Sequence, residues 1–267
     1  MTAWLRRRWL IVLVAAWALV LVLFAFGAFS GDATIPAQRD VVAARQAVDR
    51  ATVELVRAAG PDAAVRVSGY RFLGECDISL ARSGARYRRT VELYPRSGHD
   101  ADLLAAVARR LPPRYDAEVW HRSFTAYAEG FVDLTGTAKG GVLRVKLDTG
   151  CRPATRPVTG METRPTAAER QRVADVLDLL QAKDDEPRWR TESIRCDGRD
   201  SAGVRQVALT VAHPPARPLA DAADLAPPDA TVLVRGRTLL AYREGGLSVV
   251  ADTSHGKLRV TTTSGDC

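Results

Sequence analysis

Residues 112–130, PPRYDAEVWHRSFTAYAEG, resemble residues 227–245, PPDATVLVRGRTLLAYREG. The two stretches align without gaps at an offset of 115, and eight of their nineteen positions are identical, whereas chance gives about one or two. The identical pairs are Pro112/Pro227, Pro113/Pro228, Val119/Val234, Arg122/Arg237, Ala126/Ala241, Tyr127/Tyr242, Glu129/Glu244 and Gly130/Gly245. The similarity extends to LRV at 143–145 and 258–260, to CD at 76–77 and 196–197, and, after one inserted residue, to Cys151 and Cys267. The sequence therefore predicts two copies of one structural unit.

The order of elements in each copy follows from periodicity and turn residues. In the first copy we expect a helix over 36–59, strands near 64–80 and 86–94, and a short helix at 100–110 that runs into Pro-Pro. Three closing strands with a hairpin at 136–141 complete it.

The second copy repeats this order. It opens with Thr166-Ala-Ala-Glu169, which reads as a capping box at a helix start. Strands near 188–197 and 204–212, a helix at 219–225 and a hairpin at 252–256 follow. The predicted fold class is α+β, with two tandem α-β-β-α-β-β-β units whose antiparallel sheets are covered by helices on one face. We expect the units at 36–152 and 166–267, joined by a proline-containing linker at 153–165.

The N-terminal region has the pattern of a membrane anchor. Residues 9–29 contain no charge, and at the helical rise 21 residues span about 31 Å. Arg6, Arg7 and Arg8 precede this segment, so the positive-inside rule predicts a cytoplasmic stub at 1–8 and an extracytoplasmic remainder beyond a stalk at 30–35. A cleaved signal peptide is the alternative, although the apolar run is longer than usual for one.

The four cysteines of an exported chain allow three pairings. A bond present in an ancestral single unit is inherited twice, which selects Cys76 with Cys151 and Cys196 with Cys267. Each bond closes a loop of about 75 residues, a stabilisation of roughly 4 kcal/mol in the chain-entropy model. Redox or metal chemistry is the competing interpretation. It is disfavoured because the sequence has no CxxC motif and no matched histidine, and we expect no metal and no cofactor.

Charge and composition argue against nucleic acid as a partner. Outside the first thirty residues, the chain has 35 basic and 31 acidic residues. The two signs are interleaved, and no Lys/Arg stripe is present. The basic residues include 34 Arg and 4 Lys, and asparagine does not occur. In this respect the chain resembles membrane-anchored or secreted proteins of actinobacterial type, a resemblance of composition that points to no family.

Candidate chemistry centres on the matched polar residues of the two copies, Arg122, Tyr127, Glu129, Arg237, Tyr242 and Glu244. We expect each tyrosine to face the core and each glutamate to point toward the matched arginine, as in structural strand pairing. The acids Asp77 and Asp197 also match. The run Asp252-Thr-Ser-His255 combines nucleophile and base types, but turn chemistry alone selects such residues at a hairpin tip. The four histidines do not recur between the copies.

No motif in the sequence defines a reaction, since phosphate loops, HExxH, GxSxG and calcium loops are absent. The leading hypothesis is a single-pass, membrane-anchored, non-enzymatic binding or interaction module of the cell envelope, whose partner is an extracytoplasmic or membrane protein. One alternative is a membrane-tethered envelope hydrolase that uses Glu129, Glu244 or His255. Another is an accessory or sensor subunit of a membrane complex.

Overall fold

The computed structural model describes residues 9, 13–22, 40–79, 82–154, 157–158, 163–182, 188–195, 202–213, 215 and 217–265. The chain divides into two units, residues 1–38 and a compact unit of residues 39–267. In the first unit, Trp9 and residues 13–22 are helical. The rest of the expected span at 9–29, the stub and the stalk lie outside the described residues. None of the described helices is both long and apolar enough to cross a membrane.

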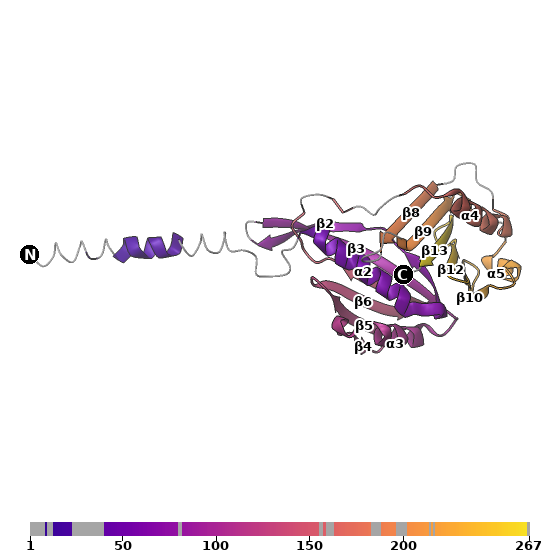
Figure 1. Ribbon diagram of the computed structural model, residues 1–267, viewed down its shortest axis with the longest axis horizontal. Coiled ribbons are helices and arrows are strands. Elements are labelled where there is room, and N and C mark those ends of the chain that lie inside the picture. Colours follow the sequence, from indigo (N-terminus) through magenta and orange to yellow (C-terminus); the bar gives the residue numbers. More distant parts are fainter. Residues whose placement is uncertain are drawn as a thin grey trace, which may run out of the picture. The chain divides into compact units, whose positions relative to one another are not determined.

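The compact unit contains two antiparallel sheets with the same strand topology (Figure 1). The first copy comprises α2 (Val41–Ala59), β1 (Ala63–Val67), β2 (Arg71–Ser79), β3 (Arg82–Pro95), α3 (Asp100–Arg110), β4 (Glu118–Trp120), β5 (Ser123–Ala128), β6 (Val132–Lys139) and β7 (Val142–Asp148). The second comprises α4 (Ala167–Leu179), β8 (Arg188–Arg195), β9 (Ala202–Val211), α5 (Leu219–Ala222), β10 (Thr231–Arg235), β11 (Leu239–Glu244), β12 (Leu247–Asp252) and β13 (Leu258–Gly265). Short 3-10 turns at Gly60–Asp62, Pro113–Tyr115 and Ala223–Leu225 complete them.

Strand order establishes the duplication in three dimensions. The first sheet runs β1-β3-β7-β6-β5-β4, with β2 also paired to β3, and the second runs β8-β9-β13-β12-β11-β10. If β1 and β2 are taken together as the counterpart of β8, the two orders are the same. The α+β class and the antiparallel pairing agree with the sequence prediction.

Two details of the predicted unit are wrong. Each copy has four closing strands rather than three, because a short edge strand, β4 or β10, precedes the predicted ones. β4 has only three residues, too few for alternation to reveal it. The predicted strand at 64–80 is also divided at Ser68, whose hydroxyl accepts a hydrogen bond from the Thr90 N–H and so replaces a regular ladder bond.

Local signals fix the element ends. The side chain of Asp40 accepts a hydrogen bond from the N–H of Val42 at the start of α2, and Gly60 with a φ of 59° ends the helix. The capping box of Thr166 and Glu169 is present at α4, as predicted. Gly140 and Gly141 join β6 to β7 with positive φ at both positions, a conformation that favours glycine.

Each sheet buries one face under its own helices. The first core gathers α2, α3 and the inward residues of β3 and β5 to β7, including Val91, Phe124 and Val145. The second gathers α4, α5 and residues such as Leu209 and Val260. We call the sheet face turned away from the helices the open face.

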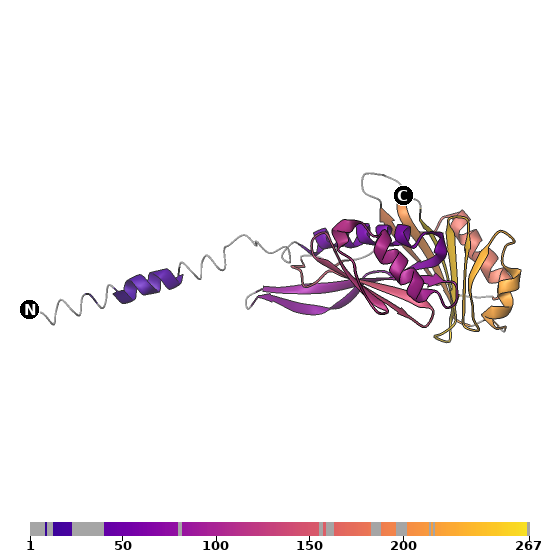
Figure 2. The same ribbon diagram turned by 90° about the horizontal axis from the view of Figure 1, so that it is seen from below.

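The two copies pack together through unlike surfaces: the β1 edge of the first sheet lies across the open face of the second (Figure 2). The side chain of Gln206 in β9 accepts from the N–H of Val67 and donates to its carbonyl, so it satisfies the free edge of β1. Arg66 forms an ion pair with Asp252 at 3.0 Å. Ala64 and Tyr94 pack with Leu233, Ala241 and Val250 in a shared apolar cluster.

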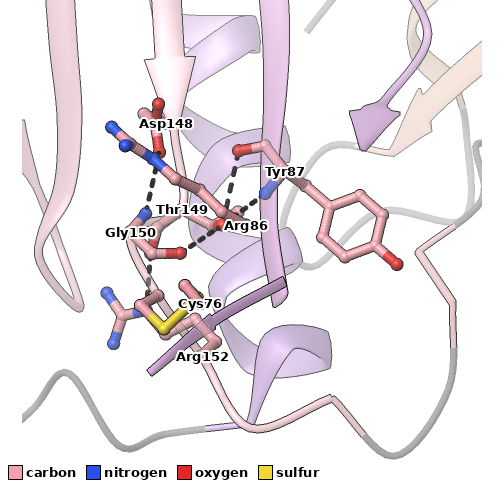
Figure 3. The surroundings of a disulfide bond; sticks show 8 residues. Cys76, Arg86, Tyr87, Asp148, Thr149, Gly150 and Arg152 are labelled. Carbon is pink, nitrogen blue, oxygen red and sulfur yellow. Dashed lines mark hydrogen bonds and ion pairs between the residues drawn. A yellow bond between two sulfur atoms is a disulfide. The ribbon is translucent and has the colours of Figure 1, made fainter. Parts of the chain in front are cut away.

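The predicted bond between Cys76 and Cys151 is present and joins β2 to the segment after β7 (Figure 3). Around it, Thr149 accepts from the N–H of Tyr87 at 3.0 Å, and Asp148 accepts from Arg86 at 2.7 Å. These contacts fix the end of the first copy to β3. Cys196 and Cys267 lie outside the described residues, so their pairing stays a prediction.

Candidate functional site: an acidic pocket in the second copy

A cavity of about 620 Å³ lies between α4 and the β11–β12 hairpin. Its walls include Arg172, Asp175, Val176 and Leu179 of α4, Pro227 and Asp229 before β10, Tyr242 and Glu244 of β11, the turn glycines 245 and 246, Leu247 and Val249 of β12, and Ser264. We call this cavity the acidic pocket. Its volume falls within the range of about 300–1,000 Å³ typical of ligand sites.

Tyr242 forms the floor of the acidic pocket. Its side chain belongs to the core of the second copy and is only 2% exposed. Within the described part of the chain, its hydroxyl makes no hydrogen bond. Burial raises the pKa of Tyr242 to about 12, and the nearby carboxylates of Glu244 and Asp175 act in the same direction. The phenol is therefore neutral and offers both a donor and an acceptor to the cavity.

Three carboxylates line the acidic pocket, those of Asp175, Asp229 and Glu244, and two of them, Glu244 and Asp175, act on the Tyr242 hydroxyl. Asp175 accepts one hydrogen bond from Gln171 at 2.8 Å. Among the described residues, none of the three carboxylates forms an ion pair, and neither does Arg172, the one cation of the lining. The pocket thus has a net negative charge and unpaired acceptor oxygens.

The corresponding place in the first copy is closed. Tyr115, only 2% exposed, fills the core there, where its aligned counterpart is Ala230. Arg50 of α2 bonds Glu129 in the β5–β6 turn at 2.8 Å. Arg114 pairs with Glu54. The same fold therefore encloses packed side chains in one copy and an acidic cavity in the other.

The matched polar residues are not equivalent in space. Tyr242 faces the core as predicted, but Tyr127 is 57% exposed on the open face of the first sheet. Glu129 pairs with Arg50 rather than with Arg122, which bonds Asp100 instead. The expected pairing of these two residues is therefore wrong.

In the second copy, Glu244 lines the acidic pocket, and Arg237 lies just before β11. The described residues show no ion pair between the two. The expected pairing of glutamate with arginine is absent here as well.

A one-residue shift explains the difference between the tyrosines. β5 (Ser123–Ala128) and β11 (Leu239–Glu244) correspond at an offset of 116, not 115. The turn after β5 has three residues and the turn after β11 has two, so the offset returns to 115 in the next strands. A shift of one residue reverses the face to which a strand residue points. Ala126 therefore takes the core position that Tyr242 occupies in the second copy.

The other candidates have structural roles or lie apart. Asp252 accepts from the N–H of Ser254 at 2.8 Å, which is the turn chemistry expected of this hairpin tip, and its second oxygen bonds Arg66. His255 is exposed in the same turn. Asp77 lies in β2, and Asp197 is outside the described residues. No group of three or more potential metal ligands gathers in the portion of the chain that is described.

A second cavity, of about 430 Å³, lies between the copies. α2 and β1 of the first copy and the open face of the second form its walls, with the guanidinium groups of Arg57 and Arg243 among them. Arg243 donates to the carbonyls of Gly60 and Ala63, so it holds the end of α2 against the second sheet. Burial lowers its pKa. This arginine is therefore committed to the packing of the two copies.

Comparisons of the chain with protein-family models, with curated proteins and with solved structures give no match. The acidic pocket is therefore interpreted from its own residues. Sequence reasoning selected Tyr242 and Glu244 but missed Asp175, Asp229 and Ala230. The signal was present in the repeat alignment, at positions where the copies differ: Arg114 against Asp229, and Tyr115 against Ala230.

Proposed function

We propose that the protein is a single-pass, membrane-anchored binding module of the cell envelope, not an enzyme, and that its second copy binds a partner through the acidic pocket. The partner is an extracytoplasmic or membrane protein. The observation that carries this proposal is the contrast between the copies, since the acidic pocket lies in the copy with Asp229 and Ala230, whereas the first copy has the ion-paired Arg114 and the packed Tyr115 at the aligned positions.

Two features support the proposed location. Residues 9–29 are uncharged and follow three arginines, which favours an N-terminus in the cytoplasm and an extracytoplasmic C-terminal region. The disulfide between Cys76 and Cys151 suits an oxidising compartment outside the cytoplasm. The duplicated units then stand on the outer side of the membrane.

A binding role fits the pocket better than hydrolysis does. A hydrolase needs an acid and a base that meet at one scissile bond. Glu129 is held by Arg50, and His255 is exposed in the β12–β13 turn, so of the three proposed catalytic residues only Glu244 lines the acidic pocket. A role as an accessory or sensor subunit remains compatible with the same pocket, provided that the bound partner carries the signal.

Site-specific photo-crosslinking in cells tests this function. A photoreactive amino acid at Leu179, on the pocket wall, is expected to give one recurrent adduct with a partner protein. The same group at Thr125, on the open face of the first sheet, is the matched control. Ala230→Tyr, which restores the bulk of Tyr115, is expected to abolish the adduct. Equal labelling from both positions, or an adduct that survives Ala230→Tyr, contradicts the proposal.

A further inference from the structure

The identity of the pocket's occupant follows from what the first copy places in the same space. There, two arginines of the chain itself approach two carboxylates: Arg50 bonds Glu129, and Arg114 bonds Glu54. In the second copy, Asp229 holds the position aligned with Arg114, and Asp175 of α4 lines the cavity on the helix side, as Arg50 of α2 does beside Glu129. The replacement of Arg114 by Asp229 reverses a charge and shortens a side chain.

Arg50 and Asp175 both lie on the helix side of the hairpin of their own copy. Arg50 lies between the buried residues Val48 and Ala51 of α2, and Asp175 lies between Val173 and Val176 of α4 with the same spacing. Arg50 bonds Glu129 in the β5–β6 turn, and Asp175 lines the cavity together with the glycines of the β11–β12 turn. Arg114 and Asp229 correspond directly in the alignment of residues 112–130 with 227–245.

The carboxylate that Arg50 neutralises in the first copy has a counterpart with no partner. Glu129, in the β5–β6 turn, is bonded by Arg50, whereas Glu244, the last residue of β11 before the corresponding turn, shares the pocket with Asp175 and Asp229. Asp175 and Asp229 are exposed and Glu244 is half-buried, so all three carboxylates can attract a cation that enters the cavity from solvent. Arg172 also lines the cavity and is exposed, as Asp175 and Asp229 are, and it makes no ion pair within the described chain.

Tyr242 supplies a second, independent indication of a ligand. This side chain is only 2% exposed. It lines the cavity, and its hydroxyl has no hydrogen-bond partner among the described residues. Although the side chain is buried, its hydroxyl is open to the cavity, where a ligand can hydrogen-bond to it. A ligand that donates a hydrogen bond satisfies this oxygen together with the surrounding carboxylates.

We propose that the acidic pocket binds the guanidinium group of an arginine side chain from the partner protein, in the place that the chain's own arginines occupy in the first copy. This inference rests on the proposed binding function and names its chemistry. A planar guanidinium with five donors matches carboxylates from two sides and the hydroxyl of Tyr242 below. A cavity of about 620 Å³ leaves room for the arginine stem and neighbouring residues of the partner.

Calorimetric titration of the full-length protein in an uncharged detergent tests the proposal. The probe is the peptide acetyl-Gly-Arg-Gly-amide, and the matched control replaces arginine with citrulline, which has nearly the same shape but no charge. We expect binding of the arginine peptide and at least about tenfold weaker binding of the citrulline peptide. Spermidine is the third ligand. Binding of spermidine without binding of the arginine peptide overturns the assignment in favour of a small amine.

Variants of the pocket sharpen the test. Glu244→Gln is expected to weaken arginine-peptide binding about tenfold, while Glu118→Gln, an exposed acid of β4, leaves it unchanged. Arg172→Gln is expected to strengthen binding, because it removes a like charge from the wall. If Arg172→Gln instead destabilises the protein and weakens binding, Arg172 is part of the occupied state and the proposal is wrong.

Asp175→Arg provides a readout that needs no ligand. It recreates in the second copy the pair that Arg50 makes with Glu129, so we expect the melting temperature to rise by about 1–3 °C and arginine-peptide binding to disappear. Unchanged binding in this variant overturns the proposal. A partner adduct from Leu179 that persists in cells while no arginine peptide binds disproves the arginine assignment and leaves the proposed function intact.

Discussion

The two copies share one strand order but use their surfaces in opposite ways. The second sheet covers its open face with the first copy, and that face carries small or hydrogen-bonding residues such as Ser248, Thr261 and Gln206. The open face of the first sheet stays exposed and carries Thr125, Arg144 and similar polar residues. In the second copy, the sheet therefore packs against the first copy, while the space between helix and hairpin forms a cavity.

The same contrast holds around the helices. In the first copy, large side chains fill the space between α2 and the β5–β6 hairpin, and two ion pairs close it. In the second copy, this space is open and acidic. The second copy can tolerate less packing between its helix and hairpin because the first copy, which packs against its sheet, contributes stability. The following predictions test this division, from the largest expected effect to the smallest.

Removal of the disulfide in the first copy is expected to have the largest effect. Cys76→Ser combined with Cys151→Ser frees a loop with a sequence separation of 75 residues, for which the chain-entropy model gives a loss of about 4 kcal/mol. Urea unfolding of the full-length protein in detergent measures it. Cys196→Ser tests the predicted second bond, with a similar loss expected. Identical melting with and without reductant contradicts both bonds.

Tyr115→Ala is expected to give the first copy the kind of cavity that the second copy has naturally. Truncation of a buried aromatic side chain costs about 3–5 kcal/mol when the surroundings do not collapse, so we expect a loss near 3 kcal/mol. Tyr127→Ala, at the exposed matched tyrosine, is the control, with a change of less than about 0.5 kcal/mol. Equal effects at both positions are incompatible with the one-residue shift.

Among the contacts between the copies, the side chain of Gln206 in β9 is the one that satisfies the edge of β1. Gln206→Met keeps the approximate size of the residue but leaves the N–H and the carbonyl of Val67 without partners. Unsatisfied buried groups of this kind cost about 1–3 kcal/mol each, so we expect a loss of about 2 kcal/mol in denaturant unfolding. Gln171→Met, on the exposed side of α4, serves as the control. A neutral result at Gln206 argues against tight packing of the copies.

The smallest effect expected is pH dependence at the start of α4. Hydrogen bonds from Arg205 and from Thr166 lower the pKa of Glu169 from 4.5 to about 2. Since the pKa is depressed in the folded state, this stabilisation is present above about pH 4.5 and is lost as the pH falls toward 2. Glu169→Gln retains the capping geometry and is expected to flatten the stability profile between these values. A profile with unchanged slope contradicts this assignment.

Several features were predictable because they depend on residues close in sequence. The α3 helix at Asp100–Arg110, the capping box at Thr166 and the hairpin glycines follow from local backbone preferences. The pairing of Cys76 with Cys151 was predictable for another reason, since an inherited duplication restricts the choices. β4 escaped prediction because three residues carry no period.

The candidate site was only partly predictable. Tyr242 and Glu244 were selected because they match residues of the first copy, yet the pocket depends on positions that do not match, Asp175, Asp229 and Ala230. Identity between repeats does not guarantee an equivalent position, since Tyr127 is exposed and Tyr242 is buried. Difference between repeats marks where one copy has changed its role, and only the structure shows which differences meet in space.

The sequence by itself determined that the chain contains two α+β units with antiparallel sheets, and which cysteines of the first copy pair, because periodicity, caps and repeats act over short distances or survive duplication. The tertiary structure decided which face each strand presents, how the edge of one sheet meets the open face of the other, and where unpaired carboxylates gather. A turn that is one residue shorter reverses a side chain from solvent to core, and no local pattern in the sequence records such a shift.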